Sequence, residues 1–124
     1  PESVKELLMS KYLGAREEMV YMLSLAFDDN ILAINKISHG TFSAANIDKR
    51  FVLETAFRNK ARSVVLVHNH VNGNPVPSRD DLNTTKSVGD FFQGVNVHLL
   101  DHLIYTDEDI FSMAQVKKFA PLFI

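Results

Sequence analysis

The chain has 124 residues, the length of one ordinary domain, which is enough to bury a hydrophobic core without covalent cross-links. It contains no cysteine, so the sequence excludes disulfide scaffolds, cysteine nucleophiles and thiolate zinc sites such as those of the zinc deaminases. Thirteen basic and fifteen acidic side chains give a formal net charge of −2. This balance does not support nucleic acid as a partner, although the net charge does not exclude a local basic patch.

The sequence predicts neither a membrane span nor a secretion signal. No apolar run approaches the roughly 18 residues of a transmembrane helix, and the N-terminus lacks the basic-then-apolar pattern of a signal peptide. We therefore expect a soluble, cytoplasmic protein with no membrane partner, and the sequence does not indicate an oligomeric state. Because the chain begins at Pro1 rather than at Met, it is compatible with a fragment of a longer protein.

Apolar periodicity predicts helices and strands in irregular alternation. Residues 1–16 have the spacing of a short amphipathic helix, and residues 17–25 alternate as a strand. Turn residues at 28–30 and a second apolar run at 31–37 indicate a hairpin. The later elements are expected as a helix at 47–59, a buried strand at 63–67, a helix at 78–93, a strand at 95–105 and a short helix at 113–119. This pattern is typical of an α/β domain with a mixed central β-sheet and flanking helices.

One segment carries chemistry: a His-x-His pair follows the buried strand, and seven residues later a Ser-x-x-Asp group opens a helix. Side chains two apart on a strand point to the same side, so His68 and His70 can converge. Asp81, in the first helical turn, can complete the set when the loop folds back. Two imidazoles and a carboxylate bind zinc at about 2.0–2.1 Å and leave a fourth position for water. We therefore predict one Zn²⁺ per chain, with one bound water.

A zinc ion at such a site generates hydroxide near neutral pH. The reaction then needs a general base, usually a carboxylate outside the ligand set, and a donor to the oxyanion, for which the Ser78 hydroxyl is a candidate. A structural interpretation also exists, because Ser78 and Asp81 form a helix-capping pattern and a His-x-His pair can be two polar residues at a strand end. Asp80 competes with Asp81 as a ligand, but the Ser-x-x-Asp spacing favours Asp81.

The combined pattern is the signature of the JAMM metalloproteases of the JAB/MPN+ superfamily, and the local sequence resembles the RadC family. That family typically reads His-Asn-His-Pro-Ser-Gly-Asp-Pro-x-Pro-Ser-x-x-Asp, where residues 68–81 of this chain read HNHVNGNPVPSRDD. The departures at Val71, Asn72 and Asn74 affect no expected ligand, so they bear on loop shape or substrate preference rather than on metal binding. The resemblance extends from residue 17 to about residue 113.

The resemblance implies a JAB/MPN fold, related to the cytidine-deaminase fold, in residues 17–124, preceded by a helical extension in residues 1–16. It also implies a zinc-dependent hydrolase in which metal-activated water attacks an amide or isopeptide carbonyl of a peptide substrate. In JAMM enzymes a glutamate at the opening strand acts as the general acid and base. This role falls on Glu18, with Glu17 as the alternative, because a slip of one residue turns the side chain to the other face.

Two other functions stay open at this stage. The RadC name refers to DNA repair, so a non-catalytic module in repair or recombination is one alternative, and the net charge argues mildly against it. A metal-dependent phosphodiester or nucleotide hydrolase is the other, because the same hydroxide can attack either centre. The HNH nucleases are excluded, since their named residues are spread over a ββα element rather than adjacent.

Three further histidines, His39, His98 and His102, are expected to be structural or to lie at the surface. The alternative for one of them is that Asp101 and His102 support a ligand histidine, because such ligands usually have a hydrogen-bonding partner.

Overall fold

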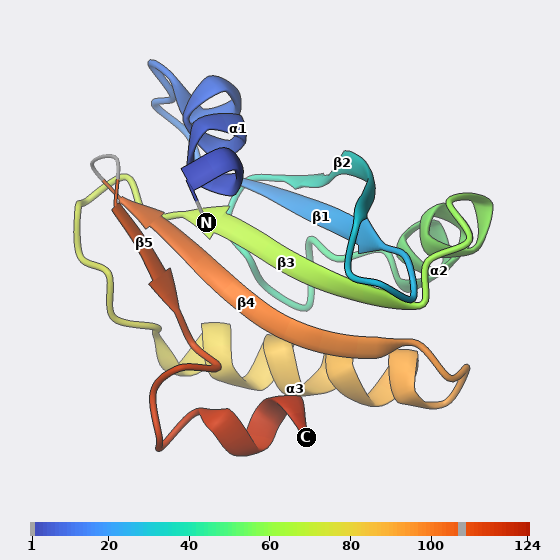
Figure 1. Cartoon of the computed structure of the whole chain (residues 1–124). Helices are drawn as coiled ribbons and strands as arrows, with labels where there is room; N and C mark the ends of the chain where they lie inside the picture. Colours follow the sequence, from blue (N-terminus) through green and yellow to red (C-terminus); the bar gives the residue numbers. More distant parts are fainter. Residues whose placement is uncertain (1, 107–108) are drawn as a thin grey trace.

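The computed structural model describes residues 2–106 and 109–124 and shows a central sheet with helices on both sides (Figure 1). The elements in chain order are α1 (Glu2–Tyr12), β1 (Met19–Leu25), β2 (Ile31–His39), α2 (Lys49–Arg58), β3 (Ser63–Asn69), α3 (Arg79–Gln93), β4 (His98–Thr106), β5 (Asp109–Ser112) and the 3₁₀ helix η1 (Ala120–Phe123). The five strands lie in the order β2-β1-β3-β4-β5. This architecture confirms the predicted mixed α/β fold. Pro1, the first residue of the expected extension, lies outside the described residues.

The sheet is mixed because only one pair of neighbouring strands is parallel. β1 pairs antiparallel with both β2 and β3, and β5 pairs antiparallel with β4. β3 and β4 are parallel, and a parallel pair needs a crossover connection, which α3 supplies. The crossover brings the start of α3 close to the end of β3, because the loop between them has to turn back along the sheet.

Successive side chains of each strand point to opposite faces of the sheet, and each face has its own core. On the α3 face, the face that packs against α3, the core contains Val20 and Met22 of β1, Val64 and Leu66 of β3, and Val88 and Phe92 of the helix itself. On the α1 face, the face that packs against α1, it contains Leu8 and Tyr12 of the helix with Tyr21, Leu23, Val67 and Tyr105 of the strands. Because side chains alternate with a period of two, neighbouring residues of one strand serve different cores.

Three expectations near the C-terminus differ from the structure. β4 begins at His98 rather than at 95, because Asn96 turns the chain with a φ of 61°. β5 was not predicted, and its four residues are too few for a clear alternation. Residues 113–119 form turns, not a helix, and η1 follows them. In two of these turns, Val116 N donates to Met113 O and Phe119 N donates to Val116 O. These apolar residues are three apart in the sequence, a spacing that also occurs in helices, and this explains the wrong prediction.

Within the described ranges, no helix combines the length and the apolar character that a bilayer crossing needs.

Candidate metal centre

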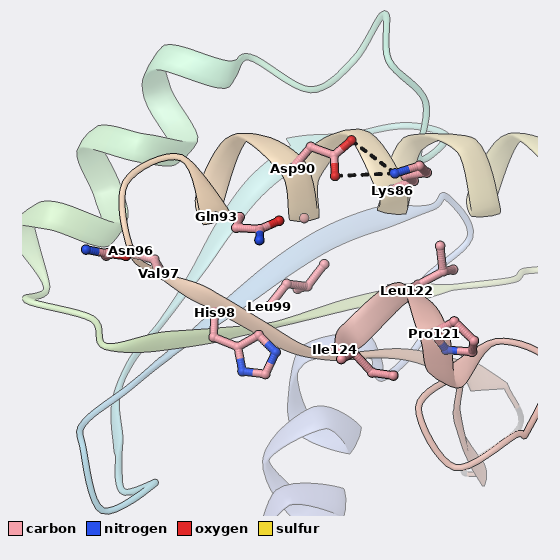
Figure 2. Close-up of a pocket in the computed structure, with 11 residues that line it drawn as sticks. Lys86, Asp90, Gln93, Asn96, Val97, His98, Leu99, Pro121, Leu122 and Ile124 are labelled. Carbon is pink, nitrogen blue, oxygen red and sulfur yellow. Dashed lines mark hydrogen bonds and ion pairs between the residues drawn. The ribbon is translucent and has the colours of Figure 1, made fainter.

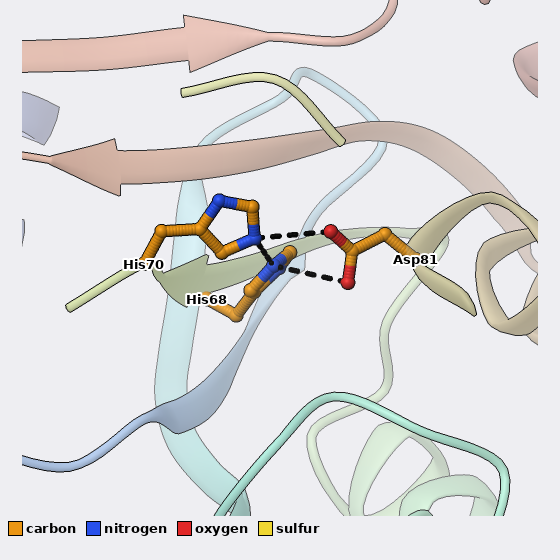
Figure 3. Close-up of side chains that lie close together, drawn as sticks. All are labelled: His68, His70 and Asp81. Atoms are coloured by element: carbon orange, nitrogen blue, oxygen red, sulfur yellow. Dashed lines mark hydrogen bonds and ion pairs between the residues drawn. The ribbon is translucent and has the colours of Figure 1, made fainter. Parts of the chain in front are cut away.

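The end of β3 and the start of α3 bring together the three residues that were predicted to bind a metal. The Nε2 atoms of His68 and His70 lie 2.8 Å apart, His70 Nε2 lies 3.0 Å from Asp81 Oδ2, and His68 Nε2 lies 3.4 Å from Asp81 Oδ1 (Figure 3). One ligand atom from each residue lies within 4.8 Å of the other two. The three side chains therefore form a group that could hold a metal ion.

The spacing of these atoms fits a tetrahedral ion. Bonds of about 2.0–2.1 Å in a tetrahedron separate neighbouring ligand atoms by about 3.3–3.4 Å. The separations here run from 2.8 to 3.4 Å, so the side chains need to move apart by only a few tenths of an ångström. Two imidazole nitrogens and one carboxylate oxygen suit a divalent transition metal, but this donor set does not single out one ion.

Asp81 serves both the helix cap and the candidate site. Ser78 Oγ accepts from Asp81 N at 3.0 Å, and Asp81 Oδ2 accepts from Ser78 N at 2.9 Å, which is a complete capping box. The cap holds the carboxylate beside the two rings, so the structural and the metal-binding interpretations are compatible. Asp80 is exposed in the same helical turn and is not part of the metal-binding group.

Electrostatics favour a charged carboxylate beside the imidazoles. Burial raises the pKa of Asp81, but hydrogen bonds to His68 and His70 outweigh it, and the net pKa lies far below the ordinary carboxyl value. The hydrogen bond to Asp81 raises the pKa of His70, although partial burial opposes the shift. The lowered pKa keeps the Asp81 carboxylate charged beside two imidazole rings.

Each ligand histidine has a partner for its other ring nitrogen. His70 Nδ1 lies 2.6 Å from the main-chain oxygen of Asn74, and His68 Nδ1 lies 2.6 Å from His102 Nε2. His102 is completely buried, and this burial lowers its pKa well below the ordinary imidazole value. Phe42, also buried, stacks on the His68 ring with centroids 5.2 Å apart. The sequence predicts a structural role for His102, with support of a ligand histidine as the alternative. The contact between His102 and His68 favours the alternative.

The other two histidines are structural, as expected. His39 forms an exposed ion pair with Glu17, and His98 Nε2 lies 2.6 Å from the main-chain oxygen of Phe123. Asp101 contacts the main chain of His102, because its Oδ1 accepts from His102 N at 2.7 Å. Its carboxylate accepts from Ala114 N at 2.9 Å and contacts the Ser112 hydroxyl, so it holds the chain around β5.

The two candidate glutamates interact with different histidines. Glu17 is occupied by its surface pair with His39, whereas the negative charge of Glu18 contributes to the raised pKa of His70. Asn69, which stands between the two ligand histidines in the sequence, clamps the main chain around Glu18. Its Oδ1 accepts from Met19 N at 2.8 Å, and its Nδ2 donates to Glu17 O at 3.1 Å. The catalytic roles of Glu18 and Ser78 stay predictions.

The surface has a hollow beside His70 and larger ones elsewhere. A hollow of about 230 Å³ beside His70 is lined by the end of α1 and by Asn69 and Tyr105. A cavity of about 700 Å³ lies at the opposite end of β4, near His98, where Lys86 and Asp90 form an ion pair (Figure 2). None of the three candidate ligands lines this larger cavity.

A five-stranded mixed sheet with helices on both faces, and a His-His-Asp group at the end of its central strand, are consistent with a JAB/MPN-type domain. The sequence model described as the RadC-like JAB domain matches residues 1–118, so the chain belongs to this family. The match includes α1 as well as the sheet and its crossover helix.

Relatives in three bacteria carry the name UPF0758 protein. The chain is 33% identical over 117 residues to the protein of Alkaliphilus oremlandii, covering 94% of this chain and 50% of the relative. It is 37% identical over 109 residues to that of Caldanaerobacter subterraneus subsp. tengcongensis, covering 86% and 46%. It is 35% identical over 115 residues to that of Paracidovorax citrulli, covering 93% and 48%. The chain thus spans about half the length of these relatives, and their name states no reaction.

Proposed function

We propose that this chain is a zinc-dependent hydrolase that cleaves amide or isopeptide bonds of peptide substrates. The observation that carries the proposal is the convergence of His68, His70 and Asp81 at one point, where His70 is partly exposed. The side chains of His68 and Asp81 are 0% and 5% exposed, whereas that of His70 is 11% exposed. A catalytic site needs such an opening, because a substrate has to approach the fourth position of the ion.

A divalent ion held by these three residues would supply Lewis acidity and lower the pKa of a coordinated water. In the proposal, the Glu18 carboxylate accepts a proton from the attacking water and passes it to the nitrogen of the leaving amine. Two observations support this role. The charge of Glu18 contributes to the raised pKa of His70, and Asn69 forms hydrogen bonds with the main chain on both sides of Glu18. The Ser78 hydroxyl donates to the carbonyl oxygen as negative charge develops there. Its oxygen already accepts from Asp81 N, which leaves its hydrogen for the substrate.

The test combines elemental analysis with cleavage assays of the purified chain. We expect about one zinc per chain in wild type and none in His68→Ala, because one ligand is lost. Two probes are an internally quenched peptide pool and a peptide joined to a lysine side chain through an isopeptide bond. Zinc-dependent cleavage of either probe, absent in His68→Ala, supports the proposal.

Two results would contradict the proposed reaction. Zinc-dependent cleavage of bis(4-nitrophenyl) phosphate, without cleavage of either peptide probe, would indicate a phosphodiesterase. DNA binding that weakens steeply with salt, without any hydrolysis, would indicate a non-catalytic DNA module.

A further inference from the structure

Behind the metal centre, buried polar side chains form a chain of hydrogen bonds that the proposed reaction does not use. His102 Nε2 lies 2.6 Å from His68 Nδ1, and His102 Nδ1 lies 2.6 Å from Thr85 Oγ1. The Thr85 hydroxyl also lies 2.6 Å from the main-chain oxygen of Asp81. These contacts connect α3, β4 and β3, and they begin and end on two of the three candidate ligands.

The direction of each hydrogen bond follows from the hydrogens that are available. A hydroxyl has one hydrogen and a carbonyl can only accept, so Thr85 donates to Asp81 O. Thr85 Oγ1 is then an acceptor, and His102 Nδ1 carries the hydrogen that it receives. A neutral imidazole has one N–H, so His102 Nε2 accepts from His68 Nδ1. The Nε2 of a neutral His68 is left with its lone pair facing the metal centre.

The hydrogen-bonded side chains lie in the buried core. His68, His102 and Thr85 are completely buried, and a charge that leaves water is costly unless it is paired. Phe42 stacks on His68 and meets the His102 ring edge-on, with centroids 4.6 Å apart. The side-chain partners of His102 in the described part of the chain are His68 and Thr85, and neither is an anion. A second N–H on His102 would point at His68 Nδ1 and drive the His68 hydrogen onto Nε2, where it would block a metal.

We propose that Thr85 and His102 are positioning residues that set the tautomer of His68, so that Nε2 is the atom offered to a divalent cation. The inference rests on the metal-binding part of the proposed function and does not depend on the substrate. His70 reaches the same tautomer directly, because the main-chain oxygen 2.6 Å from its Nδ1 can only accept. Partners of this kind orient metal-binding histidines, and their loss typically weakens metal binding by about 10- to 100-fold.

The test compares Thr85→Val, which keeps the shape of the side chain but removes its hydroxyl, with Thr85→Ser, which keeps the hydroxyl. Zinc affinity is measured by competition with a chromophoric chelator. The His68 tautomer is read from ¹⁵N NMR of the ring nitrogens in metal-free protein, about two pH units above the ordinary imidazole pKa. We expect the Nδ1–H form in wild type and Thr85→Ser. In Thr85→Val we expect a mixture of both forms and about 10- to 100-fold weaker zinc binding.

A second pair of variants tests His102 by conservative rescue. His102→Gln offers an amide oxygen to His68 Nδ1–H, whereas His102→Leu offers no acceptor. We expect His102→Gln to retain more zinc affinity than His102→Leu. Equal loss in both variants would overturn the role of His102 as an acceptor.

Other outcomes separate this inference from the proposed hydrolase. A wild-type spectrum with the hydrogen on His68 Nε2 overturns the inference even when every variant fails to fold. Equal zinc affinity in wild type and folded Thr85→Val also overturns it, and wild type that binds no zinc overturns both claims. Zinc bound tightly by wild type and weakly by Thr85→Val supports the inference even without amide cleavage, a result that would contradict the hydrolase alone.

Discussion

The two faces of β3 use buried polar side chains in different ways. On the α3 face, His68 contacts other side chains, the ring of His102 and the carboxylate of Asp81. On the α1 face, Asn69 forms hydrogen bonds with main-chain atoms just before β1 and at its start. Side chains that contact one another can rearrange around a ligand, whereas bonds to the main chain hold segments in place. Substitutions on the α3 face should therefore alter metal binding, and substitutions on the α1 face should alter stability.

The largest effect is expected for Glu18, the proposed general base, which lies between the two main-chain contacts of Asn69. Glu18→Gln should lower kcat by about 10²- to 10⁴-fold, because it removes a general base. Zinc content should not change, because Glu18 is not a ligand. Glu17→Gln is the matched control, since that carboxylate pairs with His39 at the surface. Lost turnover in Glu17→Gln with normal turnover in Glu18→Gln would assign the role to Glu17.

A second effect concerns the acid stability of the metal-free protein. Folding lowers the pKa of Asp81. Its contribution to the free energy of unfolding is therefore present above the unfolded carboxyl pKa of about 3.9 and is lost as pH falls. The pKa of His70 is raised, so its contribution is present below about 6.5 and is lost as pH rises through the folded value. Their joint contribution should be largest between these limits. It should exceed that of a neutral hydrogen bond, because charge-assisted bonds are roughly twice as strong.

Urea unfolding of the metal-free protein across this pH range measures the contribution. Asp81→Asn should flatten the dependence of the free energy of unfolding on pH at both the acidic and the neutral end. It removes the carboxylate itself and the charge that shifts the His70 pKa. An unchanged profile in Asp81→Asn would show that other groups cause the pH dependence.

A smaller effect is expected on the α1 face at Asn69. Asn69→Ala should lower the free energy of unfolding by about 1–3 kcal/mol, because it leaves Met19 N–H and Glu17 C=O without their partner. Zinc affinity should stay close to the wild-type value, since the side chain lies on the other face from the ligands. Urea denaturation and chelator competition measure the two quantities. A large loss of zinc affinity with little loss of stability would break the distinction between the faces.

The smallest effect is expected for Tyr12 of α1. Its hydroxyl contacts Met19 O at 3.0 Å and Val67 O at 3.2 Å. Tyr12→Phe should cost about 1 kcal/mol of stability, because the ring keeps its contacts with Tyr21 and Tyr105. Zinc binding and turnover should be unchanged. Thermal unfolding of wild type and variant under the same conditions gives the difference, and a gain in stability would contradict the role of the hydroxyl.

The sequence predicted the local part of the site, gave the supporting role of His102 only as an alternative, and missed Thr85. His68 and His70 could be placed together because a strand has a period of two, and Asp81 because a capping pattern marks the start of its helix. His102 and Thr85 depend on the register in which β4 pairs with β3, where His102 stands beside Leu66. No local periodicity encodes a register across a crossover. The capping box was also predicted, as an alternative to a metal ligand, and the structure shows that one aspartate can serve in both.

Positions 72 and 74 of the loop between His70 and Ser78 can vary in sequence without loss of the contact to His70. The partner of His70 in this loop is a main-chain oxygen, so any residue at position 74 supplies it. The side chains of Asn72 and Asn74 accept from loop amides, which serine and aspartate can do as well. Mutational drift at these solvent-facing positions can therefore reshape the rim that meets a substrate while the ion-binding geometry is inherited unchanged.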